Sequence, residues 1–206
     1  MTTVTSNLAI SLDGYTAGPN QDLDNPIGVD GSRVHDWMFA TATMSGEGER
    51  TVDDDAVDAI VAGNGAYIMG RNMFGPGRGE WDLDWTGWWG DNPPYHAPVF
   101  VLTSHPREPL EMQGGTTFTF VTDGVESALK QARAVAGDKN VAIAGGADTV
   151  QQFLRAGLLD ELTLHITPVI LGKGERLLEN IGDTTFEQVE AIPSGRVIHA
   201  TYRVVR

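Results

Sequence analysis

A pair of glycines, Gly145-Gly146, stands between a short apolar run and a segment with a helical pattern, in the stretch VAIAGGADTVQQFLRAGLLDE at residues 141–161. The start of a helix leaves backbone N–H groups without partners, and the helix dipole favours negative charge there. Glycines let a ligand approach the backbone, where a Cβ would block it. The pattern therefore indicates either an anion site, most often for a phosphate, or a tight turn without a ligand, since the full G-x-G-x-x-G fingerprint is absent.

Polar residues follow two other apolar runs at the point where each run ends. Arg71 comes after the run that ends at Met69, and Thr103 and Ser104 come after the run that ends at Leu102. Ligands of open α/β sheets bind at the carboxyl ends of the strands. If the three strands are neighbours, these groups suit a dinucleotide with an extra phosphate, and arginine near the ribose favours NADP over NAD. Taken singly, Arg71 is explained more simply as a surface arginine, and Thr103 and Ser104 as turn residues, whereas the agreement of three strand ends favours the binding site.

Composition excludes several classes of function. The chain has 206 residues, a formal net charge of −14 and no cysteine. Because its 14 basic residues are scattered among 28 acidic ones, we expect no nucleic-acid partner. The absence of cysteine removes disulfides, thiolate nucleophiles and cysteine zinc sites, and we expect no metal. With no apolar run of about 18 residues and no basic region before the first apolar stretch, we expect neither a membrane span nor a secretory signal. A cytoplasmic location is the default.

Apolar runs and turn residues predict alternating strands and helices. Expected strands cover residues 4–11, 66–69, 98–103, 117–121, 140–144 and 162–167, with a C-terminal hairpin at 186–192 and 196–205. Expected helices cover 34–44, 53–62, 125–136 and 148–156. This alternation indicates an α/β fold, with a mostly parallel central sheet flanked by helices and a C-terminal antiparallel hairpin. We expect one domain over residues 1–206, with a Trp-rich insertion at about 72–97 that is too long for an ordinary connection.

These motifs resemble the dihydrofolate reductase superfamily, and most closely proteins similar to the reductase half of the bifunctional riboflavin-biosynthesis deaminase-reductase. The matching segments are LAISLDGYTAGP at 8–19, YIMGRNMF at 67–74, PVFVLTSHP at 98–106 and IAGGADTVQQFLRAGLLDELTLHITPVILGKG at 143–174. They span nearly the whole chain in family order. The zinc deaminase half is absent, since its signature requires cysteine.

The resemblance implies NADPH as cofactor and assigns residues to it. Ala9, Ile10, Ala17 and Gly18 would line the nicotinamide. The adenosine phosphates would be surrounded by Gly70, Arg71, Asn72, Thr103, Ser104 and His105. The pyrophosphate would be held by Gly145, Gly146, Ala147, Asp148 and Thr149. The resemblance also implies a homodimer, as in riboflavin-type members.

Two departures leave the substrate open. Dihydrofolate reductases carry a carboxylate on the first helix, a few residues before a Trp or Phe. Counted back from Trp37, that position falls near Val34, and Asp36 points to another face of the helix. Riboflavin-type reductases often carry an acidic residue just before the paired glycines, where this chain has Ala144. For the substrates of both families, this chain therefore lacks a side chain that would anchor them.

Three side chains are candidates for a catalytic proton donor. His165 matches a family position near the substrate, or is a hydrogen-bonded histidine of the sheet. Asp13 is the second, or simply forms the turn before Gly14. Asp36 is the third, or is an exposed helix residue.

Aromatic residues are candidates for substrate contact. Trp37, Trp81 and Trp88 could stack on a heteroaromatic ring. Alternatively, the tryptophans of residues 72–97 pack that insertion against the sheet or a dimer partner. The spacing of residues 81, 85 and 88 fits one helical face, although the nearby Gly and Pro residues allow only a short helix.

Four functions follow. The first is an NADPH-dependent reductase of a small heterocycle or imine, similar to 5-amino-6-(5-phosphoribosylamino)uracil reductase. The second is dihydrofolate reductase activity with displaced ligands, and the third a non-catalytic NADP-binding module. The fourth is a relative that uses a flavin or deazaflavin, against which Arg71 and Ser104 argue.

Overall fold

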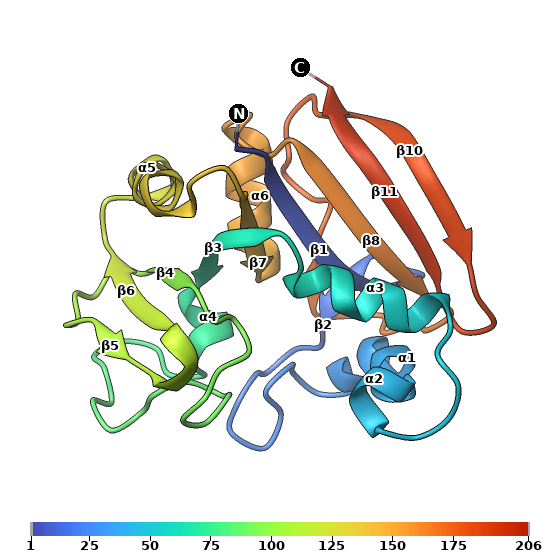
Figure 1. Cartoon of the computed structure of the whole chain (residues 1–206), viewed down its shortest axis with the longest axis horizontal. Helices are drawn as coiled ribbons and strands as arrows, with labels where there is room; N and C mark the ends of the chain where they lie inside the picture. The colour runs from blue at the N-terminus through green and yellow to red at the C-terminus, as the bar shows by residue number, and fades with distance from the viewer. Residues whose placement is uncertain (1, 206) are drawn as a thin grey trace.

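A nine-stranded sheet forms the centre of the computed structural model, which describes residues 2–205 (Figure 1). The order across the sheet is β10-β11-β8-β1-β7-β3-β4-β6-β5. The strands are β1 (Val4–Ser11), β3 (Asn64–Gly70), β4 (Pro98–Leu102), β5 (Leu110–Glu111), β6 (Thr117–Val121), β7 (Asn140–Gly145), β8 (Glu161–Thr167), β10 (Thr185–Pro193) and β11 (Ile198–Val205).

The middle of this sheet is parallel and its edges are antiparallel. β8, β1, β7, β3, β4 and β6 run in the same direction, whereas β11, β10 and β5 run against their neighbours. Parallel strands need crossover connections, and the helices between them supply these. The predicted α/β fold with a C-terminal antiparallel hairpin is confirmed.

Helices cover both faces of the sheet. α6 (Ala147–Arg155) lies behind it, and α3 (Val52–Val61) crosses its front (Figure 1). Alternate residues of β3 serve the two sides. Ala66 and Ile68 are fully buried in the core that includes α5 (Val125–Ala136) and α6, while Tyr67 and Met69 pack on the other side.

The segment predicted as one helix over residues 34–44 is instead three short helical pieces. They are η1 (Gly31–His35), α1 (Asp36–Phe39) and α2 (Ala42–Ser45). Thr41 separates the last two, because it adopts an extended conformation and its side chain accepts a hydrogen bond from Met44 N. A threonine that caps a new helix cannot also continue the previous one.

Several short elements were not predicted from the sequence. They are α4 (Arg71–Phe74), η2 (Gln113–Gly115), the edge strand β5, and a separate small sheet of β2 (Tyr15–Ala17) and β9 (Glu175–Arg176). Elements of two to four residues are too short for a hydrophobic period. Residues 75–97 contain neither helix nor strand. The tryptophans at 81, 85 and 88 are spaced for one helical face, but they do not lie on a helix. Within residues 2–205, no helix has the length and apolar character needed to cross a bilayer.

Candidate functional site

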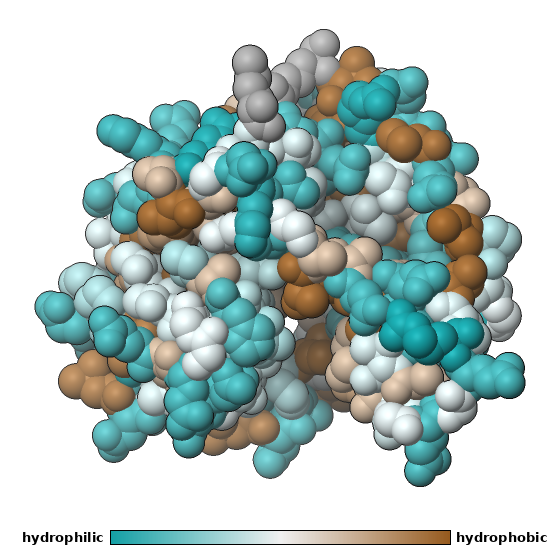
Figure 2. Space-filling view, in the orientation of Figure 1, coloured by the Kyte–Doolittle hydropathy of each residue, from teal (hydrophilic) through white to brown (hydrophobic). Residues whose placement is uncertain are grey.

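The ends of three neighbouring strands bring the predicted phosphate-binding segments together. β7, β3 and β4 are adjacent and parallel, so Gly145, Gly70 and Leu102 end at the same edge of the sheet. The register pairs Met69 with Gly145 and Gly70 with Leu102. Figure 2 shows a hollow near the middle of the face that carries α3. It lies between the half of the molecule that contains β4, β5 and β6 and the half that contains α1, α2 and α3.

The first turn of α6 has the properties of an anion site. Gly146 occupies the N-cap position with extended backbone and supplies no side-chain cap. A Cβ built on Gly146 would meet nothing within 4 Å, so the space in front of it is open. Thr149 is buried one turn further, where a Cβ on Gly70 would come within 2.4 Å of its Oγ1. Gly70 therefore allows α6 to pack closely against β3, and leaves the helix start accessible to a ligand.

Arg71 lies against Trp81 at the end of β3. Its guanidinium carbon is 3.8 Å from the centre of the Trp81 ring, and its Nη2 donates to the Glu80 carbonyl at 3.2 Å. The Trp81 indole donates to the His105 carbonyl at 2.7 Å. Trp81, predicted to contact substrate, is thus placed on the predicted phosphate side of the sheet edge.

Arg107 joins this cluster and was missed in the sequence analysis. Its guanidinium carbon lies 5.4 Å from the centre of the Trp81 ring, and its Nη2 donates to the Leu83 carbonyl at 2.9 Å. Arg71 Nε and Arg107 Nη1 are both buried without a hydrogen-bond partner. Neither arginine forms an ion pair within residues 2–205. Its position three residues after Ser104 is the only signal that could have found Arg107.

Electrostatics at this cluster favour an anion. Burial lowers the pKa of Arg71, and the charge of Arg78 lowers it further. Burial also lowers the pKa of Arg107. Both arginines stay charged at neutral pH, because the ordinary pKa of arginine is so high. Two cations with unused donors, in a chain of net charge −14, form a local positive field.

The other residues predicted to bind phosphate lie around this edge. Thr103 Oγ1 accepts a hydrogen bond from His105 N at 3.1 Å, and Ser104 is exposed beside the His105 ring. Asn72 is exposed, and its carbonyl accepts from Gln21 Nε2 at 2.9 Å. Asp148 accepts from Gln152 Nε2 at 2.6 Å, which directs its carboxylate along α6.

The residues predicted to line the nicotinamide lie on β1 and in the loop after it. Ala9 is buried on the face of β1 that carries α3, whereas Ile10 faces the core with α6. Ala17 belongs to β2, and Gly18 packs so tightly that a Cβ would lie 1.9 Å from the Val29 carbonyl oxygen. Of the two predicted residues on β1, Ala9 and Ile10, only Ala9 lies on the face of the sheet that has the hollow.

A buried chain of hydrogen bonds runs beneath α3. His199 Nε2 lies 2.9 Å from Asp53 Oδ1, and His199 Nδ1 lies 2.6 Å from His165 Nδ1. His165 Nε2 contacts Asn7 Oδ1. The Trp37 ring packs against both imidazoles. Its centre lies 4.6 Å from the ring centre of His165 and 5.0 Å from that of His199. His165 therefore has the geometry of a hydrogen-bonded histidine of the sheet, and its role as proton donor stays a prediction.

Burial, and then the charges of His199 and His35, lower the pKa of His165 to about 3. His35 lies in the same region, and burial lowers its pKa to about 4. Two polar atoms of this region, His35 Nδ1 and Trp37 Nε1, are buried without partners. The imidazoles of His165 and His35 are therefore neutral at pH 7, and the region has unused hydrogen-bonding groups.

The two aspartates predicted as proton donors lie elsewhere. Asp13 accepts hydrogen bonds from Ser11 Oγ at 2.7 Å and from the backbone of Leu171 and Gly172. The bond from Ser11 is the largest cause that lowers the pKa of Asp13 to about 2, so this carboxylate holds the loop after β8 and carries no proton at neutral pH. Asp36 is exposed on α1.

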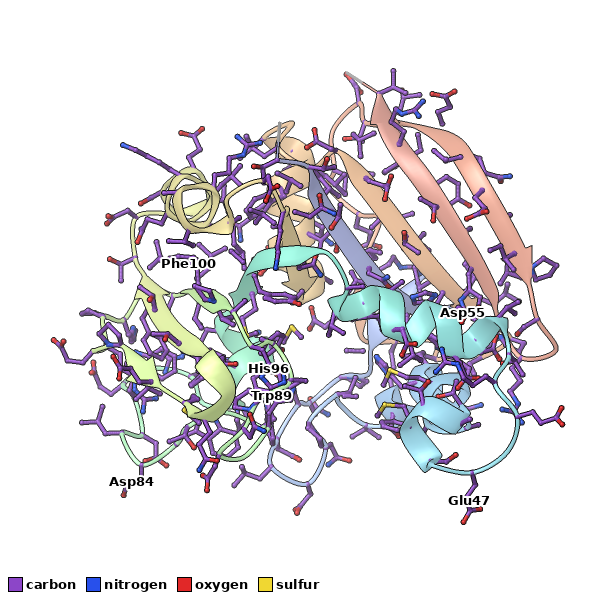
Figure 3. All side chains as sticks on the ribbon, in the orientation of Figure 1. Glu47, Asp55, Asp84, Trp89, His96 and Phe100 are labelled. Atoms are coloured by element: carbon purple, nitrogen blue, oxygen red, sulfur yellow. The ribbon has the colours of Figure 1, made fainter. Side chains whose placement is uncertain are left out.

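The remaining tryptophans pack the long insertion. Trp85 donates to the Phe74 carbonyl at 3.0 Å, and Trp88 packs against Trp85 with ring centres 4.7 Å apart. Trp89 contacts Tyr95 and Phe118. Figure 3 shows Trp89 inside the lobe formed by this insertion, while Asp84 points to solvent at its edge. Trp85, Trp88 and Trp89 thus make the contacts expected of side chains that pack the insertion.

The sequence profile of the RibD C-terminal domain matches residues 2–199. The chain belongs to this family. The uncharacterized protein YwjB of Bacillus subtilis (strain 168) is 31% identical over 183 residues, which cover 86% of this chain and 83% of YwjB.

Solved structures show the same fold. The deaminase and 5-amino-6-(5-phosphoribosylamino)uracil reductase of Thermotoga maritima superposes with a TM-score of 0.60 at 17% identity, over 99% of this chain and 57% of that protein. Dihydrofolate reductase from Enterococcus faecalis, complexed with NADP(H), superposes with a TM-score of 0.56 at 14% identity, over 99% and 97%. The RibD C-terminal domain of this chain therefore has the dihydrofolate reductase fold.

Within this RibD C-terminal domain, two buried carboxylates lie in the first turn of α3, at the end of this helix where Figure 3 labels Asp55. The position that corresponds to the helix carboxylate of dihydrofolate reductases was expected near Val34, which is buried in η1. The helix directly before β3 is α3, whose first turn carries the buried Asp53 and Asp54. The Asp54 carboxylate accepts hydrogen bonds from the backbone N–H groups of Thr43 and Thr51. The Asp53 carboxylate pairs instead with His199. Asp53 and His199 are thus site candidates that the sequence analysis missed.

Proposed function

We propose that the chain is an NADPH-dependent reductase of a small heterocyclic substrate, similar to 5-amino-6-(5-phosphoribosylamino)uracil reductase. The observation that carries this proposal is the pair Arg71 and Arg107, whose unpartnered, buried guanidinium nitrogens flank Trp81 next to an uncapped helix start. Membership of the RibD C-terminal domain family supports a reductase, and the complex of a similarly folded protein with NADP(H) supports the cofactor.

The residues present fit this cofactor. Gly145, Gly146 and the first turn of α6 would hold the pyrophosphate through backbone N–H groups, since nothing fills the space in front of Gly146. Arg71 and Arg107 would hold the 2′-phosphate by charge-assisted hydrogen bonds. Ala9 leaves room for the flat nicotinamide on β1. When bound, NADPH supplies a hydride, while the chain supplies binding, orientation and exclusion of water.

Arginine substitutions test the cofactor assignment. Arg71→Ala and Arg107→Ala should each weaken NADPH binding by about 10- to 100-fold, because a hydrogen bond to a charged group contributes about 1.5–3 kcal/mol. NADH, which lacks the 2′-phosphate, should lose less than about threefold, about 0.6 kcal/mol. Titration of cofactor fluorescence measures both. Arg203→Ala is the matched control, because Arg203 is exposed and pairs with Glu187 on the C-terminal hairpin. Equal losses for NADPH and NADH would refute the assignment.

Dihydrofolate reductase activity is the second candidate, because the first turn of α3 carries a buried carboxylate, that of Asp53. Oxidation of NADPH on addition of 5-amino-6-(5-phosphoribosylamino)uracil supports the first function, and oxidation with dihydrofolate supports the second. Tight NADPH binding with no oxidation by either compound would favour a non-catalytic binding module.

A further inference from the structure

Trp81 is a single aromatic ring that two arginines share. Its ring centre lies 3.8 Å from the guanidinium carbon of Arg71 and 5.4 Å from that of Arg107. Both distances fall within the range of about 6 Å in which a cation is attracted to an aromatic face, and tryptophan attracts cations most strongly. One ring therefore contacts positive charges from two separate segments, α4 and the connection after β4.

The Trp81 ring is itself held in place by the sheet. Its indole N–H donates to the His105 carbonyl at 2.7 Å. Its ring packs against Phe74 of α4 and Phe120 of β6, with ring centres 5.8 Å and 5.0 Å away. Ordering a free arginine side chain on binding costs rotational entropy, and a fixed support reduces that cost because the side chain is ordered before the ligand arrives.

The same part of the insertion orients both guanidinium groups without using charge. Arg71 Nη2 donates to the Glu80 carbonyl at 3.2 Å, and Arg107 Nη2 donates to the Leu83 carbonyl at 2.9 Å. Arg71 Nε and Arg107 Nη1 are buried without a hydrogen-bond partner, and each belongs to a guanidinium that lies against the Trp81 ring. The face of an aromatic ring accepts N–H groups weakly. Two backbone carbonyls and one ring, all uncharged, therefore fix the orientation of both side chains.

An uncharged support leaves the charges of the arginines available to a ligand. Within residues 2–205, Arg71 and Arg107 form no ion pair, whereas Arg50 and Arg203 pair with carboxylates. A carboxylate in place of the Trp81 ring would also hold a guanidinium, but it would compete with a phosphate for the same donors. Arg71 Nη1 and Arg107 Nε are neither buried nor hydrogen-bonded in the described chain, so they are the donors that remain for a ligand.

We propose that Trp81 is a positioning residue that determines selectivity for NADPH over NADH, because it holds Arg71 and Arg107 together as a paired site for the 2′-phosphate. The inference rests on the proposed reductase function and gives the Trp-rich insertion a role in it. A phosphate between the two guanidinium groups offsets their mutual repulsion. NADH has a hydroxyl group in place of this phosphate, so it gains little from the paired arginines.

Substitution of Trp81 tests this role through selectivity. Trp81→Leu should lower the ratio of NADPH affinity to NADH affinity by about tenfold, because both arginines lose the aromatic face. Trp81→Phe keeps an aromatic face but loses the hydrogen bond to His105, so it should lower the ratio by only about threefold. Titration of cofactor fluorescence measures both affinities. Competition by 2′,5′-ADP and by 5′-ADP gives the same comparison without the nicotinamide.

Trp85→Leu is the matched control. Trp85 packs the same insertion and donates to the Phe74 carbonyl at 3.0 Å, but no guanidinium of the described residues lies over its ring. Its loss should disturb the packing of the insertion and leave the ratio within about twofold of wild type. An unchanged ratio in Trp81→Leu, or an equal fall in Trp81→Leu and Trp85→Leu, would overturn the proposal.

Arginine side-chain NMR tests the stack in the wild-type protein and needs no variant that folds. Because the guanidinium of Arg71 lies over the Trp81 ring, the ring current should move its Nε–H proton resonance upfield of those of exposed arginines. A resonance among those of the exposed arginines would overturn the stacked arrangement.

The two proposals fail separately. If Arg71→Ala and Arg107→Ala leave the ratio unchanged, the cofactor assignment is refuted. If they lower the ratio and Trp81→Leu does not, only the role of Trp81 is refuted.

Discussion

The buried His165 makes the stability of the fold depend on pH in a calculable way. The ordinary pKa of histidine is about 6.5, and in the folded chain the pKa of His165 is lowered to about 3. Below pH 6.5 the unfolded chain therefore binds a proton that the folded chain does not. The unfolded state binds more protons in this range, so stability rises with pH and is lost as pH falls from 6.5 toward 3.

The magnitude follows from the size of this difference. Each pH unit between the two pKa values changes the free energy of unfolding by about 1.36 kcal/mol. At pH 4 the loss assigned to His165 is therefore about 3 kcal/mol, a large share of the 5–15 kcal/mol typical of a domain. His35 is lowered in the same direction, to about 4, and acts in the same window.

His165→Gln removes this titration while keeping a polar side chain. Urea unfolding at pH 7, 6, 5 and 4, followed by tryptophan fluorescence, gives the free energy of unfolding of each protein. The variant should be less stable than wild type at pH 7, yet lose about 3 kcal/mol less between pH 7 and pH 4. His96→Gln, at an exposed position, should follow the wild-type slope. Parallel curves for wild type and His165→Gln would refute the argument.

Two further substitutions probe the packing that supports the site. Gly65→Ala should destabilise the fold by about 1–3 kcal/mol in urea unfolding, because its Cβ would lie 2.5 Å from the Ala136 carbonyl oxygen, while Gly195→Ala, with open space around it, should be close to neutral. Phe153→Ala should cost about 3–5 kcal/mol, since Phe153 is fully buried between α6 and the sheet, and a loss below about 1 kcal/mol would contradict that packing.

The parts of the fold that depend on long local patterns could be predicted from the sequence. The apolar run ending at Leu102 and the amphipathic segment 125–136 appear in the structure within a residue of their expected bounds. The run over residues 34–44 has the same local character, but Thr41 prefers to cap a helix and divides it. That competition between a cap and a continued helix is decided by tertiary packing.

The candidate site also has a part that could be predicted from local sequence patterns and a part that could not. Glycines and hydroxyls after apolar runs can be recognised locally, so the phosphate-binding segments could be proposed. The pairing of Asp53 with His199 joins residues separated by 146 positions, and no local pattern predicts it. Likewise, Arg107 becomes a candidate only when the fold brings it beside Trp81 and Arg71.

The position of β1 in the middle of the sheet has a consequence for how the protein is made. β1 is the first strand to leave the ribosome, yet its partners β7 and β8 begin at Asn140 and Glu161. Until about two thirds of the chain has been synthesised, an apolar strand waits with both edges unpaired, and closing such long loops is slow. Nascent chains of this protein should therefore depend on chaperones late into translation, and truncated products should aggregate rather than retain partial function.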